Sequence, residues 1–343
     1  MNSGEVFKGI NYKIIGAMPE NISGVEDNPD NVRDGYCFFA VNGEKYNGED
    51  FAAAAAENGA DVVVSEKPLN LTCCNVIVGN IRECMGAVCK NFYLGENPKI
   101  KITGVVGTNG KTSVCHVLYN IFSYAGKKSA YLGTLGGKIG EEETESELTT
   151  PGTVELYKFI GKAEKAGTEY LFMELSAHAI CQKRDYGLFY ESLIFTNCTE
   201  DHLDYFKTME EYAAVKKSAF DRRKCKYMII NSDDATGREI LNDNEGANVL
   251  TYGIYNPADV FAIDITERTD GLGFIVNLFD IIYEMSSPLI GLCNVYNLLA
   301  SLCFGALAGL KIHTLSGAVR KIGAISGRAE RIAELNNADI FLD

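Results

Sequence analysis

The sequence predicts an α/β protein with a small N-terminal α/β domain and a larger, mostly parallel α/β domain of the P-loop type with an antiparallel edge. Three observations predict this. The chain has 343 residues, more than one hydrophobic core usually supports. From about residue 99 to 253, short apolar runs alternate with helical stretches, which is typical of a parallel sheet covered on both faces. A glycine-rich turn joins the first of these runs to the first helix.

In the first domain, residues 1–97, we expect three strands and one helix, at 35–43, 61–66, 75–79 and 49–60 respectively. The helix contains five consecutive alanines, the best helix formers, and Gly59 ends it. Gly95 and Pro98 interrupt the pattern before the next strand, and we place the domain boundary there.

The second domain, residues 98–335, begins with alternating strands and helices. The expected strands are 99–107, 129–135, 170–176, 191–197, 226–231 and 248–253. The expected helices between them are 112–126, 152–166, 207–222 and 235–243. From 259 to 290 the apolar period shortens toward two, which predicts an antiparallel edge. Two more helices are expected at 292–309 and 313–322.

Composition excludes several classes of partner. The formal net charge of −14 argues against nucleic acid and anionic membranes. The longest apolar run is too short to span a bilayer, and the first residues do not form a secretory segment. The 11 cysteines include no C-x-x-C spacing, and several lie in apolar runs. We therefore expect a cytoplasmic monomer with reduced thiols.

The segment "ITGVVGTNGKTSV", residues 102–114, is a glycine-rich phosphate loop. It departs from the strict P-loop pattern because Val105 stands where that pattern has a glycine. Backbone amides and the helix N-terminus stabilise phosphate charge, Lys111 can reach the terminal phosphates, and the Thr112 hydroxyl can bind Mg²⁺. A glycine-rich turn with a surface lysine is the alternative, but the strand–loop–helix context favours a nucleotide site. Its predicted residues are Gly107, Thr108, Asn109, Gly110, Lys111, Thr112 and Ser113.

Eight segments in order resemble the Mur ligase superfamily, the ATP-dependent amide-forming ligases of peptidoglycan precursor synthesis. Within it, the chain is similar to the MurE type, UDP-N-acetylmuramoyl-tripeptide synthetase. The segments are "GTNGKT", "TTPG", "MELSAH", "FTNCTEDHLDYF", "YAAVKKSAF", "NSDD", "GLCNVYNLLA" and "GRAER". The resemblance implies that residues 1–97 bind the UDP-MurNAc nucleotide sugar and that residues 98–335 bind ATP.

The resemblance also implies a set of metal ligands and catalytic residues. Glu174, at the end of a strand, would bind Mg²⁺ together with Thr112, although a surface glutamate is the alternative. His202 would bind a second Mg²⁺, an unusual role for imidazole, and could instead belong to a solvated loop. Lys216 would be carbamylated and become an oxygen ligand, whereas residues alone favour an amphipathic helix with solvated lysines. Arg328 would meet the ATP phosphates.

Other residues match positions that contact substrates in the family. Asn297, like Asn109, resembles an adenine contact, and Asn294 is the weaker candidate. The positions that would contact the nucleotide-sugar peptide are Thr149, Thr150, Ser176, Gln182 and Arg184. Thr149 and Thr150 could instead serve only as helix caps. We expect His178 to be structural and "NSDD", residues 231–234, to close a strand and cap a helix.

The implied reaction uses ATP and Mg²⁺ to convert a substrate carboxylate into an acyl phosphate, which an amine then attacks. For the MurE type the acceptor is UDP-MurNAc-L-Ala-D-Glu, and the donor is meso-diaminopimelate or L-lysine. Two alternatives are a P-loop ATP-binding module without ligase activity and another superfamily member such as folylpolyglutamate synthase.

The sequence departs from the family pattern at two places. Asn28, Pro29 and Asp30 occupy the places of an Asp-Ser-Arg triplet whose serine helps to hold the UDP group. Residues 336–343 look like the start of a linker to a C-terminal Rossmann-like domain, with Asp343 as the first residue of that domain's opening segment. We therefore expect the chain of residues 1–343 to hold ATP weakly and not to complete ligation alone.

Overall fold

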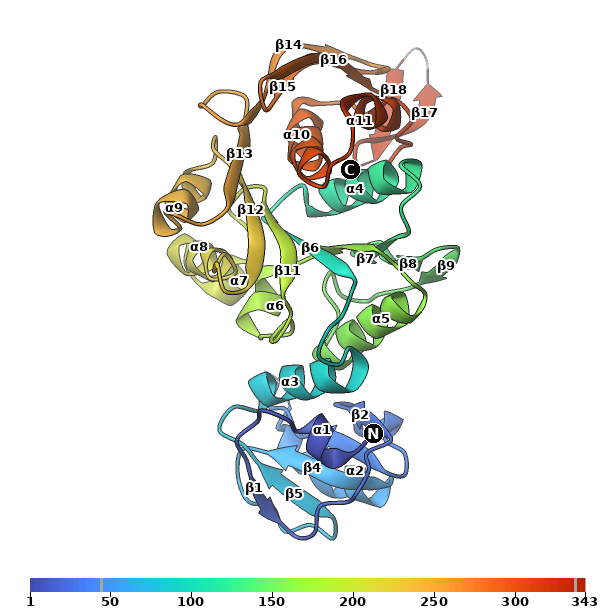
Figure 1. Ribbon diagram of the computed structural model, residues 1–343, viewed down its shortest axis with the longest axis vertical. Helices are drawn as coiled ribbons and strands as arrows, with labels where there is room; N and C mark the ends of the chain where they lie inside the picture. Colours follow the sequence, from blue (N-terminus) through green and yellow to red (C-terminus); the bar gives the residue numbers. More distant parts are fainter. Residues whose placement is uncertain (44–45, 336–337, 343) are drawn as a thin grey trace. The chain divides into compact units, whose positions relative to one another are not determined.

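The computed structural model describes all residues except 44–45, 336–337 and 343. The chain divides into two compact units, each with a sheet of its own (Figure 1). Unit 1 consists of Met1–Lys99, Pro151–Lys165 and Cys181–Leu188, and unit 2 consists of Ile100–Thr150, Ala166–Ile180 and Phe189–Asp343. The expected α/β class with a small first sheet and a larger, mostly parallel second sheet is confirmed. Asp343 and residues 336–337 of the expected linker lie outside the described residues.

Unit 1 is built on a five-stranded sheet in the order β1-β5-β4-β3-β2. Four of its strands are parallel, namely β2 (Gly24–Glu26), β3 (Tyr36–Phe39), β4 (Ala60–Ser65) and β5 (Cys74–Ile77). The fifth, β1 (Lys13–Ile15), pairs antiparallel with β5. The helices are α1 (Ser3–Val6), η1 (Pro29–Asn31), η2 (Gly48–Phe51), α2 (Ala52–Glu57), α3 (Ile81–Tyr93) and α5 (Thr153–Lys165).

Helix α3 was absent from the expected elements, although its start follows a simple capping pattern. Asn80 accepts a hydrogen bond from the backbone N–H of Glu83, and its own amide donates to the Glu83 carboxylate. Val88 and Cys89 are buried, and α3 packs against α5 in the same unit. Its buried residues Ile81, Cys84, Met85, Val88 and Cys89 follow the i, i+3, i+4 spacing of a helix, so the pattern was present in the sequence.

Unit 2 is built on an 11-stranded sheet in the order β16-β15-β14-β13-β12-β11-β6-β10-β7-β8-β9. Its parallel part comprises β6 (Lys101–Val106), β7 (Ser129–Gly133), β10 (Tyr170–Glu174), β11 (Tyr190–Phe195), β12 (Cys225–Asn231), β13 (Val249–Gly253) and β14 (Val260–Arg268). Strand β6 lies between β11 and β10, so the strand order reverses beside it. In open α/β sheets, ligands bind outside the carboxyl ends of the strands at such a reversal.

Both edges of this sheet are antiparallel. One edge consists of β15 (Gly271–Leu278) and β16 (Ile281–Ser287), and it matches the edge expected from residues 259–290. The other consists of β8 (Gly136–Ile139) and β9 (Glu142–Thr144), which the sequence did not predict because they are short and rich in glycine and glutamate. A separate hairpin joins β17 (Glu330–Leu335) to β18 (Ala338–Leu342).

The helices of unit 2 cover both faces of the sheet. On one face, α4 (Lys111–Tyr124), α10 (Leu292–Leu307) and α11 (Ile312–Val319) pack together over a core that includes Ile229 (Figure 1). On the other face, α9 (Ala235–Asp243) brings Gly237 close to the Ile230 side chain. Because neighbouring side chains of a strand point to opposite faces, α9 and α10 lie on opposite sides of β12. The short helices α6 (Ala177–Cys181), α7 (Leu203–Phe206) and α8 (Met209–Lys217) follow strands β10 and β11.

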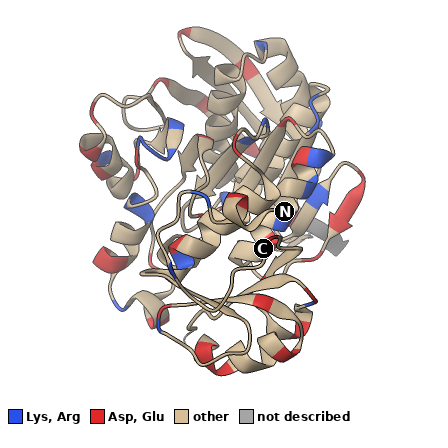
Figure 2. Cartoon of the chain, turned by 60° about the horizontal axis from the view of Figure 1, so that its bottom comes forward, with Lys and Arg blue, Asp and Glu red and all other residues tan. Residues whose placement is uncertain are grey.

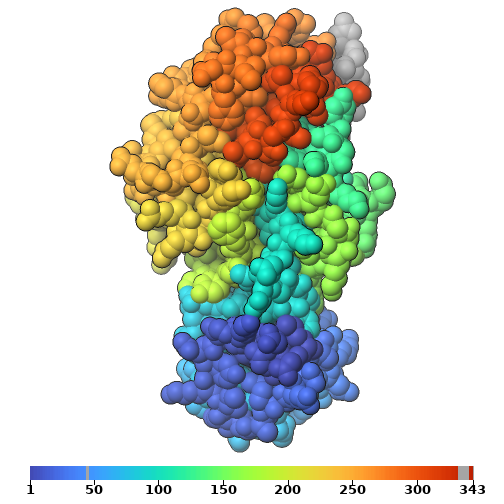
Figure 3. All heavy atoms as spheres, in the orientation of Figure 1, coloured from blue at the N-terminus to red at the C-terminus, as the bar shows by residue number. Residues whose placement is uncertain are grey.

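The residues of β14–β16, α10 and α11, coloured orange to red, gather in one continuous region of unit 2 (Figure 3). Acidic and basic residues are interspersed over both units (Figure 2). In the described part of the chain, no helix combines the length and the apolar character needed to cross a membrane.

Candidate nucleotide-binding site

The glycine-rich loop lies between β6 and α4, and the end of β11 holds its shape. Asn197 accepts from the Asn109 N–H at 2.9 Å, and its carbonyl accepts from the Thr108 N–H at 2.9 Å. The Thr196 hydroxyl donates to the Asn109 carbonyl at 2.6 Å. Thr196 and Asn197, which directly follow β11, therefore hold the loop in this shape without a ligand.

Two glycines of the loop are required by the space around them. A Cβ at Gly107 would lie 1.8 Å from the Thr196 hydroxyl, which no side chain permits. Gly110 precedes the first turn of α4 with φ of 86°, a left-handed conformation that favours glycine. A Cβ there would lie 2.6 Å from Asn297 Oδ1. The close approach of Asn297 explains why the sequence has a glycine at position 110 as well as at 107.

Lys111 folds back over the loop. Its Nζ donates to the carbonyls of Gly107 and Thr108, each at 2.8 Å. Burial lowers the pKa of Lys111, while the nearby Glu174 carboxylate opposes that change. The ammonium group is thus held at the centre of the phosphate loop.

Glu174, at the carboxyl end of β10, is the centre of a buried network with 1% of its surface exposed. Its Oε1 accepts from the Tyr131 hydroxyl and from the Thr134 N–H, each at 2.8 Å. Its Oε2 accepts from the Thr112 hydroxyl at 3.0 Å and from the Thr134 hydroxyl at 3.2 Å. The sequence analysis missed Tyr131 and Thr134, and the signal for them was polar residues in and after the neighbouring strand, "SAYLGTL".

The Thr112 and Glu174 oxygens suit a magnesium ion. Two ligands on neighbouring corners of an octahedral Mg²⁺ site lie about 3 Å apart, because each is about 2.1 Å from the ion. The 3.0 Å between Thr112 Oγ1 and Glu174 Oε2 matches this spacing. Among the residues that the structure describes, no three His, Cys, Asp or Glu side chains gather at one point. A Mg²⁺ ion here would therefore need further oxygens from a bound phosphate or from water. Arg328 also reaches this point, and its guanidinium donates to Thr112 Oγ1 at 3.2 Å.

Lys216, on α8, is fully buried beside the loop. Its Nζ donates a short hydrogen bond to the Thr108 hydroxyl and lies 3.8 Å from the centre of the Tyr212 ring. Both groups are neutral. Burial, together with nearby Lys111, lowers the pKa of Lys216 to about 8. A lysine with a lowered pKa is more often unprotonated, which is the form that adds CO₂ to give a carbamate.

His202 follows β11 in a left-handed conformation, with φ of 53°. Its Nε2 lies 3.5 Å from Asp201 Oδ2. Its ring contacts those of His178 and Tyr212, with centroids 5.0 and 6.1 Å away. Tyr212 in turn lies under Lys216 Nζ, so His202 is linked to the loop through these aromatic contacts rather than by a direct hydrogen bond.

Three of the predicted substrate contacts surround Glu174. The Thr150 hydroxyl donates to the Glu174 carbonyl at 2.8 Å and accepts from the Ser176 N–H at 3.0 Å. Thr149 Oγ1 and Thr134 Oγ1 lie 3.1 Å apart. Thr150 is buried and therefore joins segments of the fold, whereas Thr149 and Ser176 are more open to a ligand.

The other two predicted contacts, Gln182 and Arg184, belong to unit 1. The Arg184 guanidinium donates to Gln182 Oε1 through Nε at 3.1 Å and through Nη2 at 2.8 Å. In the same unit, Asn28 caps η1 by accepting from the Asp30 N–H at 3.0 Å, and the Pro29 carbonyl accepts from Asn58. Asn28 and Pro29 thus have a local structural role at the end of β2.

A cavity of about 570 Å³ opens beside the loop in unit 2. Pockets of this size accommodate nucleotides and other small molecules. It brings together five of the predicted residues, which are Asn109, Gly110, Ser113, Asn297 and Arg328. Asn294 lines the cavity too and accepts from the Asn297 amide at 2.9 Å. Tyr296, Asn231 and Tyr252 also line the cavity and were not predicted as site residues.

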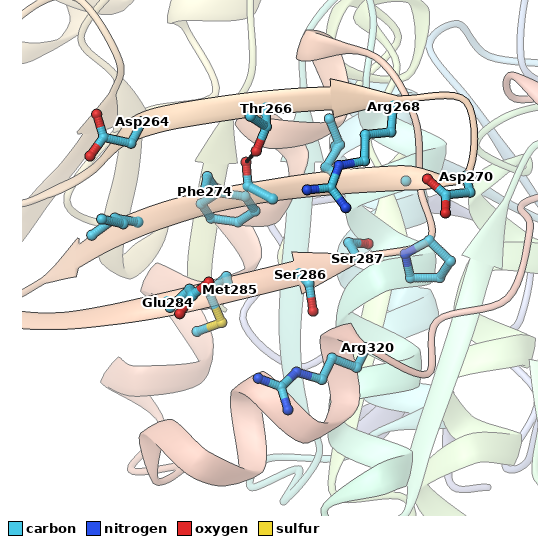
Figure 4. Close-up of a pocket in the computed structure, with 15 residues that line it drawn as sticks. Asp264, Thr266, Arg268, Asp270, Phe274, Glu284, Met285, Ser286, Ser287 and Arg320 are labelled. Carbon is cyan, nitrogen blue, oxygen red and sulfur yellow. Dashed lines mark hydrogen bonds between the residues drawn. The ribbon is translucent and has the colours of Figure 1, made fainter.

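A larger surface pocket, of about 700 Å³, contains none of the predicted residues. It lies on β14–β16 and the end of α11, with Arg268 and Arg320 at one end and Asp264 and Glu284 toward the other (Figure 4). These four charged side chains are exposed, and they come from the antiparallel-paired part of β14, from β16 and from the end of α11, far along the sheet from the reversal beside β6. The loop and its neighbouring cavity are therefore the better candidate site.

A glycine-rich loop before a helix, a buried glutamate beside its threonine and an adjoining cavity are the features expected of a P-loop-type nucleotide site. The description "Mur ligase middle domain" fits residues 105–305, and "Mur ligase family, catalytic domain" fits residues 21–106. The chain belongs to the Mur ligase family.

Among its relatives is the UDP-N-acetylmuramoyl-L-alanyl-D-glutamate–2,6-diaminopimelate ligase of Geobacillus thermodenitrificans, 34% identical over 94% of this chain and 67% of that protein. The ligase of the same name from Bacillus velezensis is 35% identical over 91% of this chain and 65% of its own length. A solved structure of a ligase of this name has a TM-score of 0.87 at 28% identity, covering 97% of this chain and 69% of its own. The chain thus spans about two thirds of the length of these relatives.

A more distant similarity concerns the fold alone. The MurF ligase of Thermotoga maritima, solved in complex with ADP, has a TM-score of 0.61 at 20% identity and covers 90% of this chain and 68% of its own.

Proposed function

We propose that this chain carries the ATP site of a MurE-type ligase, which adds a diamino acid to UDP-MurNAc-L-Ala-D-Glu through an acyl phosphate. The observation that carries this proposal is the Thr112–Glu174 oxygen pair beside the glycine-rich loop, with Arg328 on the same hydroxyl. Family membership, and the 34% identity to a ligase named for 2,6-diaminopimelate, support the reaction and the substrates.

In this mechanism, the loop amides bind the ATP phosphates. Lys111 exchanges its two carbonyl acceptors for phosphate oxygens. Arg328 supplies a second positive charge to the phosphoryl group as it transfers. Thr112 and Glu174 hold the Mg²⁺ ion, which when bound reduces the repulsion between the triphosphate and the substrate carboxylate.

The substrate supplies the remaining chemistry. A free carboxylate of the D-Glu residue attacks the γ-phosphorus, and ADP leaves. The amine of the diamino acid then attacks the acyl carbon, and phosphate leaves. Lys216, as a carbamate, would add a negative oxygen ligand close to Thr108 and to the phosphates. Residues 1–97 are proposed to hold the UDP end, and Thr149, Ser176, Gln182 and Arg184 the peptide end, of the same substrate.

Trapping the acyl phosphate tests the proposal directly. The protein is incubated with ATP, Mg²⁺, UDP-MurNAc-L-Ala-D-Glu and hydroxylamine, and the hydroxamate is detected by mass spectrometry. We expect a hydroxamate of the dipeptide substrate and none with UDP-MurNAc-L-Ala or a folate. ADP release that is the same with and without the dipeptide substrate would instead indicate an ATP-binding module without ligase activity.

A further inference from the structure

The carboxylate of Asp233, in the turn between β12 and α9, accepts an unusual number of hydrogen bonds. Three backbone N–H groups donate to it, those of Ile254 at 2.6 Å, Tyr255 at 3.0 Å and Asn256 at 2.7 Å. The Asn256 side-chain amide donates at 2.8 Å and the Tyr296 hydroxyl at 2.8 Å. The sequence analysis expected "NSDD" to cap a helix, which describes Asp234 but not Asp233.

These donors come from separate parts of unit 2. Ile254, Tyr255 and Asn256 form the turn after β13, while Tyr296 lies in the second turn of α10. Burial alone would raise the pKa of Asp233, but these hydrogen bonds lower it below its ordinary value. The charged carboxylate is therefore the stable form, and hydrogen bonds to a charged group are about twice as strong as neutral ones.

Tyr296 connects this network to the cavity. It lines the cavity together with Asn294 and Asn297 of the same helix. Without a partner for its hydroxyl, a half-buried tyrosine ring could adopt several rotamers. The bond to Asp233 Oδ2 holds the ring in one of them. Asn231, two residues before Asp233, lines the same cavity, so the turn itself is part of the wall.

We propose that Asp233 is a positioning residue of the nucleotide cavity, which holds the Tyr296 ring as a fixed wall for the nucleoside part of the nucleotide. The proposal rests on the proposed function, in which the cavity takes ATP. Asp233 makes no contact with the phosphate loop in this arrangement, so its influence is confined to the nucleoside end.

The experiment compares the affinities of ADP and inorganic tripolyphosphate by isothermal titration calorimetry. The variants are Asp233→Asn, Tyr296→Phe and the double substitution. The matched control is Asp259→Asn. Asp259 also ties the ends of the β13–β14 connection, by accepting from Thr251 at 2.8 and 2.7 Å, whereas the Tyr296 hydroxyl bonds to Asp233.

We expect Asp233→Asn to weaken ADP binding about tenfold, the size expected for losing a charge-assisted hydrogen bond, and to leave tripolyphosphate affinity within about twofold of wild type. Tyr296→Phe should weaken ADP binding about threefold. The double substitution should be no worse than Asp233→Asn, because the Tyr296 hydrogen bond that Tyr296→Phe removes is one of the five that Asp233→Asn weakens. Asp259→Asn should bind both ligands as wild type does.

Wild-type ADP affinity in Asp233→Asn would overturn the proposal, as would equal losses for ADP and tripolyphosphate. The proposal would also be overturned if the loss of ADP affinity in the double variant equalled the product of the two single losses, because Asp233 and Tyr296 would then act separately. Tyr296→Phe removes only a hydroxyl group, so the comparison survives if Asp233→Asn fails to fold. A wild-type protein that binds no ADP would refute the proposed function, whereas normal wild-type binding with an unaffected Asp233→Asn refutes only the role of Asp233.

Discussion

Replacing Lys216 by methionine should make the protein more stable while removing the group proposed for carbamylation. Lys216 is fully buried, and its pKa is lowered from 10.5 to about 8. That difference corresponds to about 3 kcal/mol of unfolding free energy lost by burying the charged amine. Methionine has a similar length and no charge. It gives up the hydrogen bond to Thr108, which contributes about 1 kcal/mol. The net gain at pH 7 is therefore about 2 kcal/mol.

The gain should depend on pH in a defined window. Between about pH 8 and 10.5 the unfolded chain keeps a proton on Lys216 that the folded protein has lost. Stability of the wild type therefore rises with pH relative to Lys216→Met. Below pH 8, Lys216→Met should show its full advantage in unfolding free energy over wild type. That advantage should disappear as pH approaches 10.5.

Urea unfolding followed by circular dichroism, in CO₂-free and metal-free buffer from pH 6.5 to 10.5, measures this difference. The control is Lys217→Met, because Lys217 pairs with Glu239 at 2.7 Å near the surface and its pKa is raised. That variant should be no more stable than wild type between pH 7 and 10. Equal stability of wild type and Lys216→Met at pH 7, or a gap that persists at pH 10.5, would refute the reasoning.

Two further predictions concern neighbouring groups. Glu174→Gln keeps the size of the side chain but removes its charge and replaces one acceptor oxygen by an NH₂ donor. The increase in ADP affinity on adding Mg²⁺ should therefore fall at least tenfold, as measured by calorimetry with and without the ion. An unchanged increase would show that Glu174 is not a metal ligand. Burial lowers the pKa of His116 to about 4, so the unfolded state protonates first as pH falls from 6.5 to 4 and wild-type stability drops there. His116→Phe should resist acid unfolding better than wild type over that range, and parallel acid-unfolding curves would contradict this.

Much of the fold could be predicted because local pattern and global structure agree. The parallel strands of unit 2 are continuous apolar runs, such as Cys225–Asn231, and the helices between them have clear ends. Helix α3 could also have been predicted, because Ile81, Cys84, Met85, Val88 and Cys89 form an apolar stripe at helical spacing. The β8–β9 hairpin was missed because its exposed residues, 140–144, are one glycine, three glutamates and a threonine. They show no alternation of apolar and polar side chains.

The candidate site was predictable to the extent that it lies in one segment. Gly107 to Ser113 are contiguous, and their loop is visible in the sequence. Their partners are not, because Asn197, Tyr131 and Thr134 reach the loop or Glu174 only through the order of strands in the sheet. The resemblance to a family supplied Glu174, Lys216 and Arg328, and the structure places all three beside the loop. Their roles stay predictions until they are measured.

The folded-back position of Lys111 has a consequence for which anions the loop admits. Its ammonium already satisfies two carbonyls of the loop, so any incoming anion competes with bonds that exist. A lone sulfate or chloride ion offers the lysine little more than it gives up. A polyphosphate chain spans the amides, the lysine and Arg328 at once and recovers the loss through several charged contacts. In this position Lys111 should therefore favour polyphosphates over small anions such as sulfate and chloride.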